Sequence, residues 1–268
     1  MMKLITLLFS LLFVFIGSCQ TTPTKRSAPT DVSKSGLITL ETRPGIEQKF
    51  IFMPSVNPSA NVILFAGGHG KLQLSSFLGW PTMKWGSNNF LVRTRKMFEK
   101  HGFMVAVVDA PYDRNVKSHL SFDRTSKDHL IDIRAVISFL KQKKPVPVWL
   151  VGTSRGTTSA THIAVNNSGQ CDGLVLTSTM SSVGGMDLEK IRIPTLIVSH
   201  REDECWPCPP EAAEMIAKGL INSPKVEVKY FSGGYAPRSE PCQALSEHGF
   251  YGIEGKVVDA IAHFIKSN

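Results

Sequence analysis

The amino-acid sequence predicts an α/β protein with a mostly parallel central sheet and helices on both faces. Two observations support this prediction: short, almost continuous apolar runs alternate with segments of helical periodicity, and two early segments alternate apolar with polar residues. Strands buried on both faces have the first pattern, and antiparallel strands at a sheet edge have the second. The 268 residues, 42% hydrophobic and 19% charged, suit one large globular domain or two small ones.

The expected strands cover residues 37–42, 48–52, 61–66, 103–108, 146–151, 173–177, 195–199 and 226–231, of which the first two form the antiparallel start. Helical spacing marks residues 90–101, 126–144, 155–165, 211–220 and 251–266. Gly102 and Pro145 follow the first two of these helices, as is typical of helix ends. Catalytic groups in such a sheet lie where strands end, at their carboxyl side.

The N-terminus resembles a bacterial lipoprotein leader. Lys3 precedes an apolar run at residues 4–16, and Ile16-Gly17-Ser18-Cys19 follows the lipobox pattern. The resemblance implies cleavage before Cys19 and acylation of its thiol, with a plain secretory leader as the alternative. Residues 1–18 are therefore expected to be a signal peptide, residues 19–36 a polar flexible tether and residues 37–268 the folded domain.

The net charge of +8 comes from scattered basic residues without aromatic interleaving or a nucleic-acid motif. We therefore expect contact with anionic lipid or cell-wall polymers rather than with nucleic acid. The leader predicts an exported protein anchored in the bacterial cell envelope. By analogy with other lipoproteins, Gln20 directly after the cysteine favours the outer membrane facing the periplasm in a Gram-negative host.

A candidate nucleophile lies at the junction of a predicted strand and a predicted helix. Gly152-Thr153-Ser154-Arg155-Gly156 has the pattern G-x-S-x-G, in which the two glycines permit a very tight turn and the serine is raised above the sheet. The N-terminus of the following helix would offer the Arg155 backbone N–H to an oxyanion. The alternative is a glycine-rich turn with an inactive serine.

The strand–turn–helix around Ser154 resembles that of the α/β-hydrolase superfamily, and the resemblance implies that an acid and then a base follow the serine along the chain. The strand at residues 195–199 runs into a loop that carries Asp203, our first choice, beside Glu202 and Glu204; Asp187 is a fourth candidate. His248 follows the last strand and precedes the last helix, so its imidazole is expected to accept the proton of Ser154 while the acid orients its other nitrogen.

The loop Gly67-Gly68-His69-Gly70 follows the predicted strand at residues 61–66 and is expected to supply a second oxyanion donor. The Gly68 N–H is our first choice, with Gly67 and His69 as alternatives. No G-K-[ST] sequence follows, so we expect no nucleotide site.

With these motifs, residues 63–264 resemble the α/β-hydrolase superfamily, and Asn89-Phe90-Leu91-Val92-Arg93 and Val108-Asp109-Ala110-Pro111 resemble a subset of bacterial lipoproteins. The resemblance implies acyl-enzyme chemistry on esters, less often on amides or thioesters. We expect no cofactor, and no metal either, because the potential ligands lack the spacing of a metal site. The segment at residues 180–191 is too short for the large cap domain of many relatives, so the site should be open, with residues 71–88, including Trp80 and Trp85, as a partial wall.

Four cysteines remain after Cys19 for an oxidising compartment. Cys171 begins a strand and Cys205 follows the end of another, so these two should be far apart. Cys242 lies on the catalytic edge. We expect a disulfide between Cys205 and Cys242, with Cys208–Cys242 as the alternative. Cys205-Trp206-Pro207-Cys208 also has the C-x-x-C spacing of redox enzymes, but it lies late in the chain, away from the first strand–helix junction where such enzymes carry it.

The sequence therefore predicts a membrane-anchored serine esterase acting on a small-molecule or cell-envelope acyl substrate. The competing hypothesis is a lipoprotein that keeps the same fold and binds ligands without turnover.

Overall fold

The computed structural model describes residues 34–113, 120 and 123–268. The predicted leader, Cys19 and residues 20–33 of the predicted tether lie outside this described part. Among the described residues, no helix is both long enough and apolar enough to cross a bilayer.

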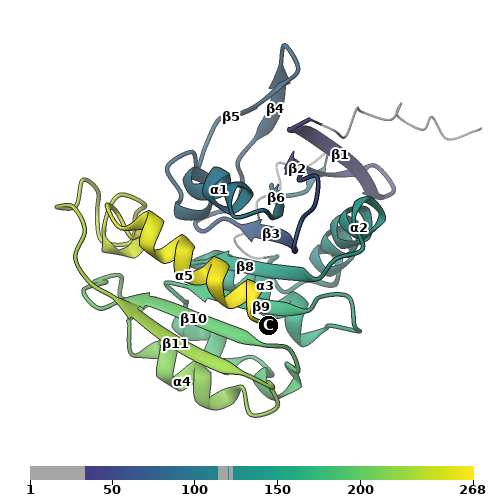
Figure 1. Cartoon of the computed structure of the whole chain (residues 1–268). Helices are drawn as coiled ribbons and strands as arrows, with labels where there is room; N and C mark the ends of the chain where they lie inside the picture. Colours follow the sequence, from purple (N-terminus) through teal and green to yellow (C-terminus); the bar gives the residue numbers. More distant parts are fainter. Residues whose placement is uncertain (1–33, 114–119, 121–122) are drawn as a thin grey trace, which may run out of the picture. The chain divides into compact units, whose positions relative to one another are not determined.

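The central sheet has the predicted mixture of strand directions (Figure 1). Its strand order is β1-β2-β6-β3-β8-β9-β10-β11, and the short β7 pairs with β2 off this path. The pairs β1–β2 and β2–β6 are antiparallel, and every later pair along the order is parallel. The strands are β1 Gly36–Arg43, β2 Ile46–Met53, β3 Asn61–Phe65, β6 Met104–Val108, β7 Tyr112–Asp113, β8 Val148–Thr153, β9 Gly173–Thr177, β10 Thr195–His200 and β11 Val226–Phe231.

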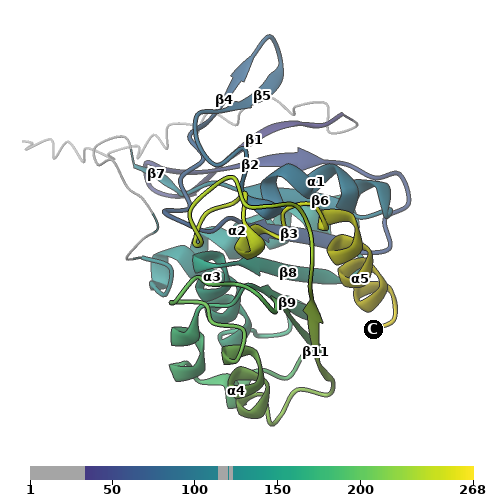
Figure 2. The same cartoon turned by 90° about the vertical axis from the view of Figure 1, so that its left-hand side faces the viewer.

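Helices cover both faces of this sheet (Figure 2). Helices α1 (Phe90–Lys100) and α5 (Glu254–Lys266) pack on one face, and α2 (Lys127–Lys143), α3 (Arg155–Val165) and α4 (Ala212–Gly219) pack on the other. Each face has its own apolar cluster, because alternate residues of the central strands point to opposite sides. The fold class predicted from the sequence is therefore correct.

Most element boundaries differ from the sequence prediction by one to three residues, two of them for clear local reasons. Strand β8 begins at Val148 and not at residue 146, since Pro145 and Pro147 cannot donate to a sheet ladder. Helix α5 begins at Glu254 and not at residue 251, because Phe250 and Gly252 have φ of 55° and 91°, outside the helical range. Strand β10 extends one residue further, to His200.

Two segments affect the shape of the predicted catalytic site. Between β9 and β10 the chain forms the short 3₁₀ turns η1 (Ser181–Gly185) and η2 (Leu188–Lys190), with no cap domain. The sequence prediction missed a separate hairpin of β4 (Leu74–Phe77) and β5 (Trp80–Met83), which follows the β3 loop.

Candidate active site

Ser154 lies in a strained turn between β8 and α3, with φ of 52° and ψ of −129°. The two glycines of the motif are sterically required. A Cβ on Gly152 would lie 2.6 Å from the Gly156 carbonyl oxygen, and a Cβ on Gly156 would lie 2.1 Å from the Phe65 carbonyl oxygen. Only hydrogen fits at these positions, so the backbone can turn sharply and hold the serine at the carboxyl edge of the sheet.

Asp203 and His248 form a hydrogen-bonded pair. Asp203 follows β10, and His248 lies in the 3₁₀ turn η3 (Glu247–Gly249) after β11. The Nδ1 of His248 lies 2.9 Å from the Oδ2 of Asp203, and both side chains are buried. The other carboxylate oxygen, Oδ1, accepts the Cys205 backbone N–H at 3.0 Å, which fixes the carboxylate in place.

The three alternative acids lie elsewhere. Glu202 is exposed and pairs with the ring of His200 at 3.1 Å. Asp187 is exposed and pairs with Lys190. Glu204 is exposed as well. Of these four carboxyl groups, the one that contacts His248 is that of Asp203.

Ser154 and His248 line the same small cavity, of about 40 Å³. The Nε2 of His248 is buried and has no hydrogen-bond partner among the described residues. The Ser154 hydroxyl lies 3.9 Å from the Cys208 sulfur. The Ser154 hydroxyl therefore makes no hydrogen bond to His248 Nε2 in this structure. Catalytic hydrogen bonds are often long without substrate and tighten in the Michaelis complex, and Nε2 is available to accept the Ser154 proton there.

The glycine loop after β3 lies against the serine. A Cβ on Gly67 would lie 3.0 Å from the Cβ of Ser154, and Gly68 has φ of 59°. Arg155 is the first residue of α3, where a backbone N–H has no partner within the helix. The residues predicted to supply oxyanion donors thus meet beside Ser154.

Arg124 supports this loop and was missed by the sequence analysis. Its guanidinium is buried, and its Nη2 donates to the carbonyl oxygens of Ala66 and Gly68, each at 3.1 Å. Its Nη1 donates to the Ser159 hydroxyl at 2.9 Å. Burial, and secondarily the charge of Arg155, lower the pKa of Arg124 to about 10, so the group stays charged at neutral pH. Arg124 thereby fixes the two peptide groups that flank the Gly67–Gly68 peptide.

Three contacts hold the loop that carries His248. The Ser178 hydroxyl donates to the His248 carbonyl oxygen at 2.8 Å. Arg93, which pairs with Glu254, donates to the carbonyl oxygen of the next residue, Gly249, at 2.5 Å. The expected disulfide between Cys205 and Cys242 is present and ties the Asp203 loop to the His248 loop.

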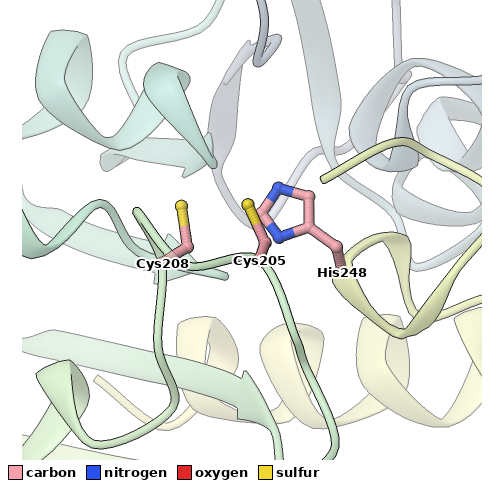
Figure 3. A group of neighbouring side chains, drawn as sticks. All are labelled: Cys205, Cys208 and His248. Carbon is pink, nitrogen blue, oxygen red and sulfur yellow. The ribbon is translucent and has the colours of Figure 1, made fainter. Parts of the chain in front are cut away.

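Cys205, Cys208 and His248 form a sulfur–nitrogen cluster (Figure 3). The two sulfur atoms and one ring nitrogen lie within 4.8 Å of one another, a spacing that metal sites also have. The Cys205 sulfur is committed to the disulfide, and burial raises the pKa of the Cys208 thiol to about 12. Because metals bind thiolates, this donor set is unsuited to a metal as it stands.

No family model and no curated protein matches the chain. Solved structures do match it. A serine hydrolase from Xanthomonas campestris, described as lacking a lid, superposes with a TM-score of 0.60 at 18% identity, over 90% of this chain and 97% of that one. A cold-adapted esterase from an Arctic intertidal metagenomic library gives 0.55 at 14% identity, over 85% and 92%. Mouse alpha/beta hydrolase domain-containing protein 10 gives 0.58 at 13%, over 87% and 99%.

The chain has the α/β-hydrolase fold. In this α/β-hydrolase fold the site is open, and a cleft of about 720 Å³ continues from the small cavity along the glycine loop. The two share six lining residues: Gly67, Gly68, Asn89, Cys242, Gln243 and Ala244. Trp85 forms part of the far wall, as expected, whereas Trp80 lies outside the cleft, at the end of the β4–β5 hairpin.

Proposed function

We propose that this protein is a serine hydrolase that cleaves carboxylic esters through an acyl-enzyme intermediate. The observation that carries the proposal is the hydrogen bond between His248 Nδ1 and Asp203 Oδ2, beside a serine in a strained strand–helix turn. This is the arrangement of acid, base and nucleophile that acyl transfer requires. The fold shared with hydrolases and esterases supports the reaction class.

In the proposed first step, the Ser154 oxygen attacks the ester carbonyl carbon and His248 Nε2 takes the hydroxyl proton. The imidazolium that forms is stabilised by Asp203, which also keeps Nδ1–H directed away from the serine. The carbonyl oxygen becomes an oxyanion and accepts N–H bonds from Gly68 and Arg155. His248 then returns the proton to the leaving alcohol, the C–O bond breaks, and the acyl group remains on Ser154.

In the second step, a water molecule attacks the acyl-enzyme while His248 Nε2 takes one of its protons. The second tetrahedral intermediate collapses, Ser154 leaves with that proton, and the carboxylic acid is released. The open cleft supports small-molecule or cell-envelope acyl groups as substrates, since no cap restricts their length among the described residues.

We further propose that the protein is exported and anchored through acylated Cys19. The support is the leader and lipobox pattern, together with a disulfide, which forms and persists in oxidising compartments. A Cys19→Ser variant should pass from the membrane fraction to the soluble fraction of cells, and unchanged retention would contradict the anchor.

Labelling with a fluorophosphonate probe tests the enzyme. The wild-type protein should be labelled, Ser154→Ala should not, and a Ser168→Ala control at an exposed serine after α3 should be labelled like the wild type. Absence of labelling in a folded wild-type protein would instead favour a binding protein that keeps the fold without turnover. Persistent labelling of Ser154→Ala would show that another residue is the nucleophile.

A further inference from the structure

The β4–β5 hairpin ends in three exposed apolar side chains, which we call the hairpin tip: Phe77, Leu78 and Trp80. Their exposed fractions are 68%, 83% and 71%, and Phe77 pairs directly with Trp80 across the hairpin. Single exposed apolar residues are common, but a contiguous group on one turn indicates a surface that binds a membrane or another protein.

The backbone of the tip is unfavourable for the residue that occupies it. The two-residue turn has φ of 50° at Leu78 and 83° at Gly79. Hairpin turns with positive φ at both positions prefer Asn, Asp or Gly in the first, because a larger side chain is strained there. Leucine at this position therefore strains the turn. Because its side chain is also exposed, we infer that the leucine contributes to binding rather than to the stability of the hairpin.

The base of the hairpin is held firmly. The buried carboxylate of Asp109 accepts the backbone N–H groups of Leu72 and Leu74 at 2.6 and 2.8 Å. The Leu72 carbonyl oxygen in turn accepts the N–H groups of Lys84 and Trp85 at 3.0 and 3.1 Å. The hairpin extends from this base away from β1 and β2 in both views (Figures 1 and 2). A fixed base with an apolar end is suited to insertion.

The chain segment that carries the hairpin is basic, apart from the buried Asp109 carboxylate that contacts its base. Residues 48–98 contain six Lys or Arg and no Asp or Glu, and Lys71 and Lys84 flank the hairpin. Basic groups behind apolar side chains match a bilayer whose anionic headgroups lie above its acyl chains. Tryptophan is enriched at that boundary, because its ring is apolar and its N–H is polar.

A protein partner suits the tip less well. A stable protein interface buries about 800 Å² on each partner, whereas three large side chains offer about 600 Å² at most. Insertion into a lipid surface needs no such area.

We propose that the hairpin tip docks on the surface of a bilayer that contains anionic lipids, with Phe77, Leu78 and Trp80 among the headgroups and upper acyl chains. The cleft that leads to Ser154 begins beside the hairpin base, at Lys71, Leu72, Lys84 and Trp85. Docking would therefore place the mouth of the cleft at the membrane surface and supply acyl substrates from it; this last step rests on the proposed function.

Tryptophan quenching tests the docking in the full chain. The protein is mixed with vesicles of phosphatidylglycerol and phosphatidylcholine whose acyl chains carry bromine, which quenches fluorescence on contact. Bromine should quench the wild-type emission, and Trp80→Phe should lose at least half of the quenched signal. Trp206→Phe is the matched control, because Trp206 is 84% exposed but lies outside the hairpin, and it should leave the quenched signal unchanged. Equal quenching in wild type and Trp80→Phe would overturn the proposal.

A second pair of variants keeps Trp80 as the reporter. Phe77→Ser/Leu78→Ser should reduce the quenching at least threefold, whereas Val56→Ser/Ile221→Ser, which removes two other exposed apolar side chains, should not. Phosphatidylcholine alone should quench more weakly than the anionic mixture. An unquenched Trp80 in a dimer that Phe77→Ser/Leu78→Ser converts to monomers would show that a second copy covers the tip, and would also overturn the proposal.

Activity separates docking from catalysis. Phe77→Ser/Leu78→Ser should hydrolyse a soluble short-chain ester at the wild-type rate, but a long-chain ester of the same alcohol embedded in anionic vesicles at least tenfold more slowly. An equal rate in vesicles would overturn the delivery role. Quenching of Trp80 without hydrolysis of either ester would uphold docking and contradict the proposed function instead.

Discussion

The disulfide between Cys205 and Cys242 should stabilise the folded protein by a predictable amount. It closes a loop with a sequence separation of 37 residues. In the chain-entropy treatment such a closure removes about 13 cal/mol/K from the unfolded ensemble, or about 4 kcal/mol at 25 °C. Cys205→Ala/Cys242→Ala should lose about this free energy of unfolding, because the two other cysteines among the described residues, Cys171 and Cys208, are not disulfide-bonded in the folded protein.

Urea unfolding followed by circular dichroism measures the effect. With a slope of about 2.5 kcal/mol/M, the midpoint of the double variant should fall by about 1.5 M. Reductant should move the wild-type midpoint toward that of the double variant, since Cys242 is exposed, and should leave the double variant unchanged. A wild-type midpoint that does not respond to reductant, or a double variant with the wild-type midpoint, would refute the reasoning.

Three further predictions concern the site and its support. Gly156→Ala should lower kcat at least 100-fold and destabilise the fold, because its Cβ would meet the Phe65 carbonyl oxygen at 2.1 Å, whereas a Cβ on Gly255 in α5 has open space and Gly255→Ala should keep both activity and stability. Arg124→Met should lower kcat about 100-fold with KM within threefold, and Arg124→Lys should recover part of the loss; an unchanged kcat would contradict the positioning role. Burial, then the charges of Arg124 and His162, lower the pKa of His129 to about 3. Below pH 6.5 His129 therefore binds a proton in the unfolded chain but stays neutral in the folded chain. The free energy of unfolding should consequently fall by about 2 kcal/mol from pH 7 to pH 5. His129→Leu should remove that slope in urea titrations at the two pH values.

Much of the sheet could be predicted because its buried strands consist almost entirely of apolar residues. Strands β3, β6 and β9 are buried along their whole length, and their apolar runs are easy to recognise. The strand–turn–helix around Ser154 followed directly, because the steric demands on Gly152 and Gly156 are local and leave a local pattern.

The β4–β5 hairpin had no comparable signal. It is exposed over most of its length, so neither face has an alternating apolar pattern, and its Leu78-Gly79 turn lacks the Asn-Gly or Asp-Gly pair that marks most hairpins. From the sequence we expect both tryptophans of residues 71–88 in a wall of the cleft, which is correct for Trp85, after the hairpin, and wrong for Trp80, within it.

Arg124 could not be predicted for a different reason. Its role depends on carbonyl groups 56 and 58 residues earlier in the chain, and a backbone carbonyl leaves no trace in the identity of Gly68 or Ala66. By contrast, the expected order of nucleophile, acid and base, together with the position of each relative to a strand end, selected Asp203 and His248. The structure places their side chains in contact.

The central claim is that Ser154 is a nucleophile activated by His248. Mass spectrometry of the protein after reaction with a fluorophosphonate tests it most directly. The account predicts one phosphonylated residue, Ser154, with labelling slowed at least 100-fold in His248→Ala. A modified residue other than Ser154, or labelling of Ser154 at the wild-type rate in a folded His248→Ala variant, would contradict it.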